Sequence, residues 1–231
     1  MHYLIGSLLL LSLWAVIFII RKDLRKEMMV ASLITTPLAL SELFFVPSYW
    51  IPDAILTPKL SIEDFIFSFA VGGIAAVLYE LLMDKRIYHQ RLCSCFQEKK
   101  VYPLILGIGI LAVLASYFLF KINFMYAAYI GILVDIILMT IVRPDLFSKI
   151  IYSSILFGLF YTLFFAAFSY LVPDFLKHWN FSALSGYTLL NIPVEEIIWG
   201  FGIGGLLGPI YEYLLGLKII RKSYVLKREN N

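Results

Sequence analysis

The chain has 231 residues, of which 61% are hydrophobic and only 15% are charged, and its formal net charge is +3. The mean hydropathy of the chain is +0.87. A water-soluble domain of this composition would expose too much apolar surface, so a soluble globular protein is excluded. We therefore expect the lipid bilayer to be its solvent, and we expect no nucleic acid among its partners.

Seven stretches are apolar and close to the length of about 20 residues that a membrane-spanning helix needs. In chain order they are Tyr3–Ile20, Met28–Val46, Ile62–Met83, Tyr102–Phe120, Phe124–Val142, Lys149–Val172 and Pro193–Leu217. The connections between them are short, which predicts an all-α integral membrane protein with its chemistry in or beside the bilayer. A basic segment follows the first stretch where a signal peptide would have a small-residue cleavage site, so we interpret this stretch as a spanning helix.

The basic residues concentrate on one side of these stretches. Only Lys59, Lys121 and Lys177 fall on the other side. The positive-inside rule then predicts a multi-pass protein of the cell membrane with its N-terminus outside and its C-terminus in the cytoplasm. Cys93 and Cys95 lie in a cytoplasmic loop of this topology and are interpreted as reduced thiols. With only His89 nearby they fall short of a zinc site, so we expect no bound metal.

The third and seventh stretches repeat each other. The identical pairs are Glu63/Glu195, Ile66/Ile198, Phe69/Phe201, Gly72/Gly204, Gly73/Gly205, Tyr79/Tyr211, Glu80/Glu212 and Leu82/Leu214. The first and fifth stretches also end alike. We predict two parallel three-helix repeats joined by a linker helix. The predicted units are 1–84 for the first repeat, 85–123 for a basic loop and the linker helix, 124–217 for the second repeat, and 218–231 for a basic tail.

Both copies carry a small residue at every fourth position. These residues are Ser68, Gly72 and Ala76 in the first copy and Gly200, Gly204 and Gly208 in the second. Such stripes allow close approach of transmembrane helices. Because the stripe occurs twice, we predict that the third and seventh helices pack on each other along it. The alternative is that each stripe packs against another neighbour.

Each copy opens with two adjacent acids, Glu63-Asp64 and Glu195-Glu196, at the outer end of its helix. Continuing the small-residue stripes by one turn predicts that Asp64 and Glu196 face each other. Glu63 and Glu195 then point about 100° away, on the side of Phe67 and Trp199. Two facing carboxylates favour retention of a proton, as a general acid requires, so we take all four acids as candidate catalytic residues. Alternatively, the acids only stabilise the helix starts.

Further residues are expected to line a polar, aromatic site near these acids. Glu42 lies near the outer end of the second stretch, and Asp135 lies about 16 Å into the fifth, at about 1.5 Å per residue. The aromatic candidates are Phe65, Phe67, Phe69, Trp199 and Phe201. Ring faces beside a proton donor can stabilise a carbocation. Glu80 and Glu212 are interpreted as snorkelling anchors at the cytoplasmic interface, beside Lys85 and Lys218.

Several seven-helix classes conflict with the sequence. A retinal protein needs a lysine in the seventh helix, and residues 193–217 contain none. A CaaX-type intramembrane protease needs an arginine where Gly200 stands and histidines inside later helices. A SWEET-type sugar transporter shares the three-one-three plan but usually carries Pro-Gln pairs, which this chain lacks. A transporter of that architecture stays open as an alternative.

The duplicated acidic motif resembles that of the heterodimer-type lycopene cyclase domain, in its fused two-half form. The residues that carry the resemblance are Glu63, Asp64, Tyr79 and Glu80 in the first copy and Pro193, Glu195, Glu196, Tyr211 and Glu212 in the second. Ser61 stands where the first motif would have proline, and both helices carry Gly-Gly where the family has bulkier residues.

The resemblance implies an intramolecular lyase or isomerase of carotenoid biosynthesis that acts on lycopene or another isoprenoid in the bilayer. A carboxylic acid protonates the terminal double bond, the next double bond closes the ring, and a carboxylate removes a proton. Which acid donates stays open, as do the ring type and the oligomeric state. The reaction has no net redox change, and no dinucleotide motif occurs, so we expect no cofactor. The alternative functions are a non-catalytic isoprenoid-binding module and a small-solute transporter.

Overall fold

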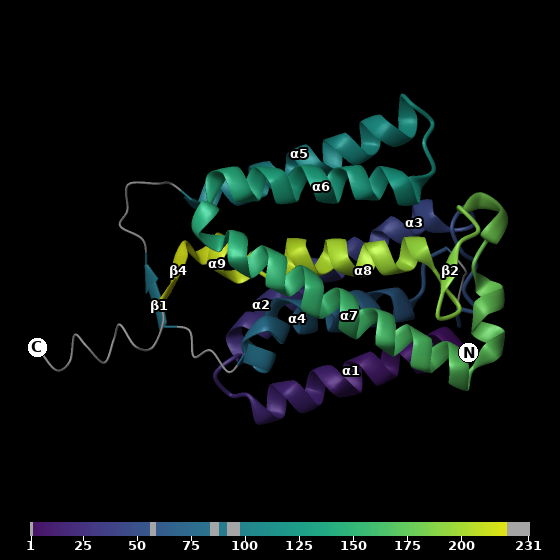
Figure 1. The fold of residues 1–231 in the computed structure, drawn as a ribbon, viewed down its shortest axis with the longest axis horizontal. Coiled ribbons are helices and arrows are strands. Elements are labelled where there is room, and N and C mark those ends of the chain that lie inside the picture. The colour runs from purple at the N-terminus through teal and green to yellow at the C-terminus, as the bar shows by residue number, and fades with distance from the viewer. Residues whose placement is uncertain (1, 56–58, 84–87, 92–97, 221–231) are drawn as a thin grey trace, which may run out of the picture.

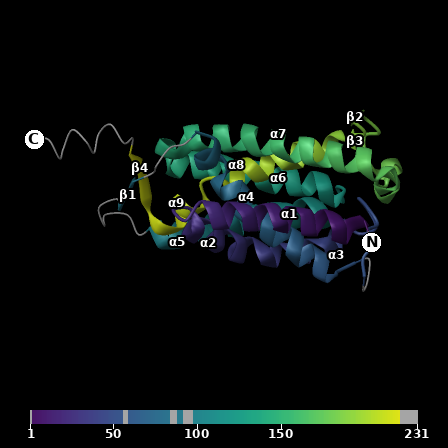
Figure 2. The same cartoon turned by 90° about the horizontal axis from the view of Figure 1, so that it is seen from below.

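The computed structural model describes residues 2–55, 59–83, 88–91 and 98–220. Cys93, Cys95 and Lys85 lie outside these ranges, so their predicted environment is not described. The structure is a bundle of long helices, and His2 and Ile220, the first and last described residues, lie at opposite ends of it (Figures 1 and 2). We call the end near His2 the N-terminal end of the bundle and the other the C-terminal end.

The helices are α1 (His2–Ile20), α2 (Arg25–Thr35), η1 (Thr36–Ser41), α3 (Glu42–Phe45), α4 (Ile62–Met83), α5 (Glu98–Phe118), α6 (Phe124–Val142), η2 (Pro144–Leu146), α7 (Phe147–Leu171), η3 (Pro173–His178), η4 (Phe181–Ala183), α8 (Val194–Leu207) and α9 (Ile210–Leu215). Two short antiparallel pairs join β1 (Tyr88–Arg91) to β4 (Leu217–Ile220), and β2 (Thr188–Leu189) to β3 (Ile192–Pro193).

Seven helical segments of the described chain are long and apolar enough to cross a membrane, which confirms the predicted all-α membrane class. Their bounds agree with the prediction to within a few residues, except that the sixth segment begins earlier, at Pro144. The division into two structural repeats stays a prediction.

Two of the predicted helices are interrupted. The second is divided into α2, η1 and α3. Pro37 at the start of η1 accounts for the interruption. Proline lacks the N–H that continues an α-helix, and its ring clashes with the preceding turn. The seventh is divided into α8 and α9 at Gly208 and Pro209 for the same reason. Each interruption changes the direction of the side chains that follow it.

The centre of the bundle is formed by α4 and α8. In each of them more than 60% of the membrane-spanning window is buried, against at most 33% in the other five segments. The α4 helix packs on α1, α2 and α7, while α8 packs on α6 and α7, and α5 packs on α6. Figure 1 shows α5 and α6 together along one side of α8, with α1 on the opposite side of the bundle.

The small-residue stripes do not pack on each other, so that prediction is wrong. A Cβ atom at Gly72 would lie 1.8 Å from Thr35 Oγ1 of α2, and one at Gly204 would lie 2.6 Å from the Ser153 carbonyl oxygen of α7. Both stripes therefore bring their helix close to the preceding membrane-spanning segment. Between α4 and α8, the rings of Phe67 and Trp199 lie 6.4 Å apart, so large side chains occupy part of that interface.

A buried charged cluster lies toward the C-terminal end. The Lys149 Nζ atom lies 3.2 Å from Glu27, 2.7 Å from Glu80 and 2.6 Å from Glu212. All four residues are at most 3% exposed. The interpretation of Glu80 and Glu212 as snorkelling anchors is therefore wrong. Opposite charge inside the bundle stabilises these carboxylates, because each would be very costly to bury without a partner.

Candidate active site

A cavity lies toward the N-terminal end of the bundle, beneath two chain segments that pair with each other. These segments, 46–55 and 173–180, are called the cover. They are joined by hydrogen bonds from Ile51 N to the His178 carbonyl (2.7 Å) and from Asn180 N to the Tyr49 carbonyl (2.9 Å). Trp50 and Trp179 are opposite each other in this pairing, and both line the cavity. The cover therefore forms one wall of the cavity.

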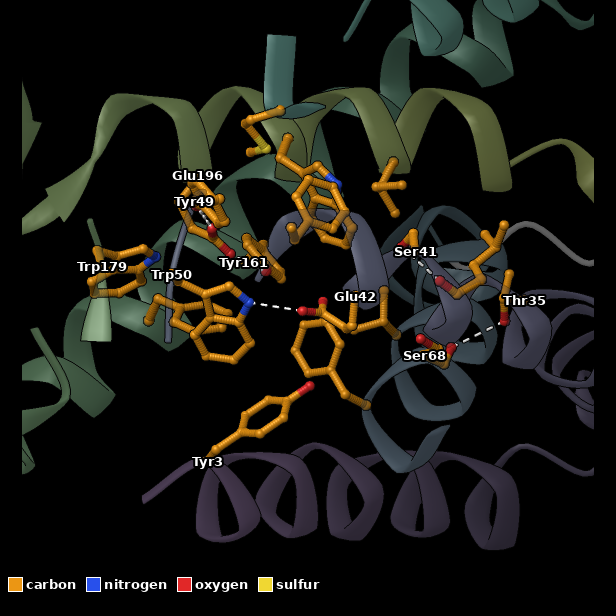
Figure 3. Close-up of a pocket in the computed structure, with 18 of the residues that line it drawn as sticks. Tyr3, Thr35, Ser41, Glu42, Tyr49, Trp50, Ser68, Tyr161, Trp179 and Glu196 are labelled. Carbon is orange, nitrogen blue, oxygen red and sulfur yellow. Dashed lines mark hydrogen bonds between the residues drawn. The ribbon is translucent and has the colours of Figure 1, made fainter. Parts of the chain in front are cut away.

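The cavity contains about 790 Å³ of empty space, part of it open to the outside. Its walls come from α1, α2, η1, α3, α4, α6, α7, α8 and the cover (Figure 3). The lining residues are Tyr3, Thr35, Leu38, Ser41, Glu42, Phe45, Tyr49, Trp50, Phe67, Ser68, Val71, Met125, Tyr161, Phe165, Phe175, Trp179, Glu196, Trp199, Ile203 and Leu207.

Aromatic rings make up much of the wall. The Tyr161 ring lies 5.3 Å from the ring of Trp199 and 4.6 Å from that of Phe165, and Phe67 lies across from Trp199. Such a wall suits an apolar ligand. The faces of these rings also attract positive charge through their quadrupoles, so the same wall can stabilise a cation that forms inside the cavity.

Glu196 is one of two carboxylates that line this cavity. It is 8% exposed and lies in the first turn of α8. Its two carboxyl oxygens accept separate hydrogen bonds from the hydroxyls of Tyr49 in the cover and Tyr161 in α7. Burial raises the pKa of Tyr49 well above its ordinary value, and the nearby Glu196 raises it further. Tyr49 thus stays protonated and remains a hydrogen-bond donor to the carboxyl group.

Glu42 is the second carboxylate of the cavity. It begins α3, directly after the interruption in the second membrane-spanning segment. Its Oε2 atom accepts a hydrogen bond of 2.8 Å from Trp50 Nε1 in the cover, as Figure 3 shows. The site thus combines two acids from different parts of the chain, each oriented by aromatic hydrogen-bond donors.

Asp64 and Glu196 do not form the predicted facing pair. Asp64 Oδ2 instead accepts a hydrogen bond of 2.6 Å from Ser61 N, directly before α4. The helical periodicity placed both residues in line with the small-residue stripes, which pack on α2 and α7 and not on each other. It could not show that one of these side chains would bind its own backbone while the other would bind two tyrosines.

Glu63 and Glu195 are outside the cavity wall and bind the loops that precede their helices. Glu63 accepts hydrogen bonds from Ile55 N (2.9 Å) and from the Ser61 hydroxyl. Glu195 Oε1 accepts them from Ser185 N (2.7 Å) and from the Tyr126 hydroxyl (2.9 Å). The prediction that these acids lie on the side of Phe67 and Trp199 is wrong, because the two rings line the cavity together with Glu196.

The remaining candidates are divided between the cavity and other packing surfaces. Phe67 and Trp199 line the cavity, but Phe65, Phe69, Phe201 and Asp135 do not. Phe69 packs on Trp14 of α1, with ring centroids 5.0 Å apart, and Phe201 lies against Gly158 of α7. Asp135 lies against Gly109, between α6 and α5. Its depth in the bilayer was therefore a poor guide to its distance from the site.

Sequence reasoning missed the polar aromatic residues of the site. Tyr49, Trp50, Tyr161 and Trp179 all line the cavity, and the first three donate hydrogen bonds to its acids. The available signal was the position of Tyr161 in the middle of a membrane-spanning stretch, where its hydroxyl needs a partner. Tyr49 and Trp50 had no comparable signal, because tyrosine and tryptophan are common at any membrane interface.

Residues 123–214 match the family model described as lycopene cyclase. This segment runs from the start of α6 into α9 and contains Tyr126, Tyr161, Glu195 and Glu196, whereas Glu42 and Tyr49 precede it. No curated protein and no solved structure matches the chain.

Proposed function

Because residues 123–214 match the lycopene cyclase family model, we propose that this multi-pass membrane protein closes the terminal ring of a carotenoid such as lycopene by acid–base chemistry at Glu196. The observation that carries the proposal is the environment of this carboxyl group. It is buried, it lies in an aromatic cavity, and two tyrosine hydroxyls fix its orientation.

The reaction begins with protonated Glu196. Its proton adds to the terminal double bond of the polyene and leaves a tertiary carbocation, while Glu196 becomes a carboxylate. The neighbouring double bond then attacks this carbocation, which closes a six-membered ring and moves the positive charge into the ring. The rings of Phe67, Tyr161 and Trp199 stabilise this charge. The cover and the apolar walls keep water from trapping the carbocation.

Loss of a proton from the ring completes the reaction and leaves a ring double bond. One proton enters and one leaves, so atoms and electrons balance without an oxidant or a reductant. We assign the second proton transfer to Glu42, because it is the other carboxylate of the cavity wall. Three other acids, Asp64, Glu63 and Glu195, were also expected to be catalytic. We assign them supporting roles, because each binds a backbone N–H near the start of its own helix and not the cavity. Before the next turnover, Glu42 has to release the accepted proton to the solvent, and Glu196 has to take up a proton from the solvent.

The proposal is tested by running the reaction in D2O with membranes that contain the wild-type chain and lycopene. A carboxyl group exchanges its proton with solvent, so each new ring should carry a deuterium that mass spectrometry detects at the protonated carbon. The Glu196→Gln variant keeps the shape of the side chain but has no acidic proton, and it should form almost no labelled ring. Glu195→Gln, the same change at the adjacent residue, is the matched control and should keep most of the activity.

Two results would contradict the proposal. If the wild-type chain is well expressed and leaves lycopene unchanged, an isoprenoid-binding or transport function becomes the better explanation. If rings form without deuterium, or if Glu196→Gln labels them as the wild type does, the proton comes from another source.

A further inference from the structure

Three potential metal ligands meet on the outer side of the cover, outside the cavity. They are His2 at the start of α1, Asp53 in the first cover segment, and His178 at the end of η3. His2 Nδ1 lies 3.3 Å from Asp53 Oδ2, and His178 Nε2 lies 3.7 Å from Asp53 Oδ1. The two imidazole rings are 5.9 Å apart. The fold thus brings together residues from three distant parts of the chain.

The contact of His178 Nδ1 determines which tautomer the neutral ring adopts. His178 Nδ1 lies 3.0 Å from the Ile51 carbonyl oxygen. A carbonyl oxygen can only accept a hydrogen bond, so Nδ1 must carry the hydrogen, and Nε2 of the neutral ring presents its lone pair to Asp53. In metal sites, a histidine ligand commonly donates its second N–H to a backbone carbonyl in this way.

The two nitrogen atoms that face Asp53 are shielded and unsatisfied. Within the described chain, His2 Nδ1 and His178 Nε2 have almost no solvent contact and no hydrogen-bond partner. A lone pair on nitrogen that faces a carboxylate oxygen is repelled unless a positive charge lies between them. Asp53 also accepts hydrogen bonds from His2 N (2.7 Å) and Tyr3 N (3.1 Å). A cation between its carboxylate and the two imidazole nitrogens would satisfy all three groups.

We propose that His2 Nδ1, His178 Nε2 and the Asp53 carboxylate bind a divalent transition-metal ion, with Zn²⁺ as the best fit. Two imidazoles and one carboxylate are a common ligand set for zinc, with a water at the fourth position. Bonds of about 2.0–2.1 Å at tetrahedral angles separate neighbouring ligand atoms by about 3.3 Å. His2 Nδ1 lies 3.3 Å from Asp53 Oδ2, which matches this value, whereas His178 Nε2 lies 3.7 Å from the other carboxylate oxygen, Oδ1. The ligand atoms of the three residues lie within 4.8 Å of one another.

The site would fasten the cover over the cavity. His178 is adjacent to Trp179, and Asp53 is three residues beyond Trp50, so the metal would connect both cover segments to the start of α1. It lies outside the cavity wall, so we assign it no step of the reaction. This site could not be predicted from the sequence, because its three residues are 51 and 125 positions apart and form no spacing motif.

The test is metal binding by the purified full-length chain in detergent. The protein carries no histidine tag, and Cys93 and Cys95 are replaced by serine so that thiolates do not bind the metal. After treatment with a chelator, calorimetric titration with buffered Zn²⁺ should show one saturable site. His2→Gln and His178→Gln should weaken the affinity by at least about 10- to 100-fold, since even changes of outer-shell partners have that effect. His89→Gln removes the third histidine of the chain and should bind zinc as before.

A second readout uses Co²⁺, whose visible absorption reports tetrahedral coordination. The parent protein should show these bands, and His178→Gln should lack them while its circular dichroism shows unchanged helix content. Absence of saturable binding, or equal binding by the His2 and His178 variants, would overturn the proposal and leave an imidazolium–carboxylate contact as the explanation. The outcome is independent of the proposed cyclase activity, because lycopene is absent from the assay.

Discussion

The helices α4 and α8 begin with similar acidic motifs, but the second acid of each motif has a different environment. In both helices the first acid, Glu63 or Glu195, binds a backbone N–H of the preceding loop. In α4 the second acid, Asp64, binds the N–H of Ser61. In α8 the second acid, Glu196, extends into the cavity and binds two tyrosine hydroxyls.

The residue three positions before the second acid accounts for the difference. Ser61 has a backbone N–H and provides it to Asp64. Pro193 occupies the equivalent position before Glu196 and has no N–H to offer. Glu196 also has one more methylene group than Asp64, which lengthens its reach. One proline thus determines whether an acid at this position stabilises its own helix start or remains available to a ligand.

The C-terminal ends of these two membrane-spanning segments bind the same lysine. Glu80 near the end of α4 and Glu212 in α9, which continues the α8 segment, both bind Lys149. We expect Lys149→Met to destabilise the protein by about 3–5 kcal/mol, because it leaves buried carboxylates without their counter-charge. The measurement is the free energy of unfolding in a mixed-detergent titration.

The control for this change is Lys177→Met. Lys177 is 78% exposed and pairs with Asp174 on the surface, so its loss should leave the unfolding transition unchanged. If Lys149→Met unfolds at the same denaturant concentration as the wild type, the buried cluster makes no net contribution to stability.

The largest effect on activity is expected from Glu196→Gln. Conversion of lycopene should fall by about 100-fold or more, the lower scale of general acid catalysis. Asp64→Asn makes the equivalent change in the first motif and should lower conversion by less than about tenfold, since Asp64 is not part of the cavity wall. Chromatography of the extracted pigments measures both. Equal losses in the two variants would show that the motifs share the chemistry after all.

A smaller loss is expected when the cavity acid loses one of its donors. Tyr161→Phe and Tyr49→Phe each remove one hydroxyl but keep the ring, so conversion should fall by roughly tenfold, as expected for one hydrogen bond of about 1.5 kcal/mol to a charged group. Tyr152→Phe is the matched control in α7, because Tyr152 is 47% exposed and is not part of the cavity wall. A tyrosine variant with wild-type conversion would mean that the other hydroxyl suffices to orient Glu196.

The smallest effect on activity should follow from exchanging Ser61 and Pro193, the residues three positions before Asp64 and Glu196. Pro193→Ser restores a backbone N–H beside Glu196 and should lower conversion by a few-fold, by drawing part of the carboxylate population toward the helix start. The measured quantity is again pigment conversion, now with folding checked by the melting temperature. Ser61→Pro is the reciprocal change and should leave conversion nearly as it was. A Pro193→Ser variant with full activity would rule out proline as the cause of the difference.

The sequence predicted the features that depend on hydrophobicity and periodicity alone. The membrane-spanning segments follow from the length and hydrophobicity of the apolar runs. Glu42, Phe67 and Trp199, which were expected near the acids, line the cavity together with Glu196. Contacts between segments could not be predicted in this way. A glycine stripe indicates that some helix approaches, but not which one, and Gly72 packs on α2. The partner of Glu80 was missed because Lys149 belongs to a distant segment and looked like a membrane-interface residue.

The cavity contains one site of protonation, Glu196, and the cover forms one of its walls. On the proposed function, a linear carotenoid with two equivalent ends can present only one of them at a time, and the rest of the molecule stays in the surrounding lipid. A second ring then requires the singly cyclised molecule to leave, reverse its direction in the bilayer and return with its other end. The balance between one-ring and two-ring products would therefore follow the ratio of carotenoid to protein, with the one-ring product accumulating wherever fresh substrate outcompetes it.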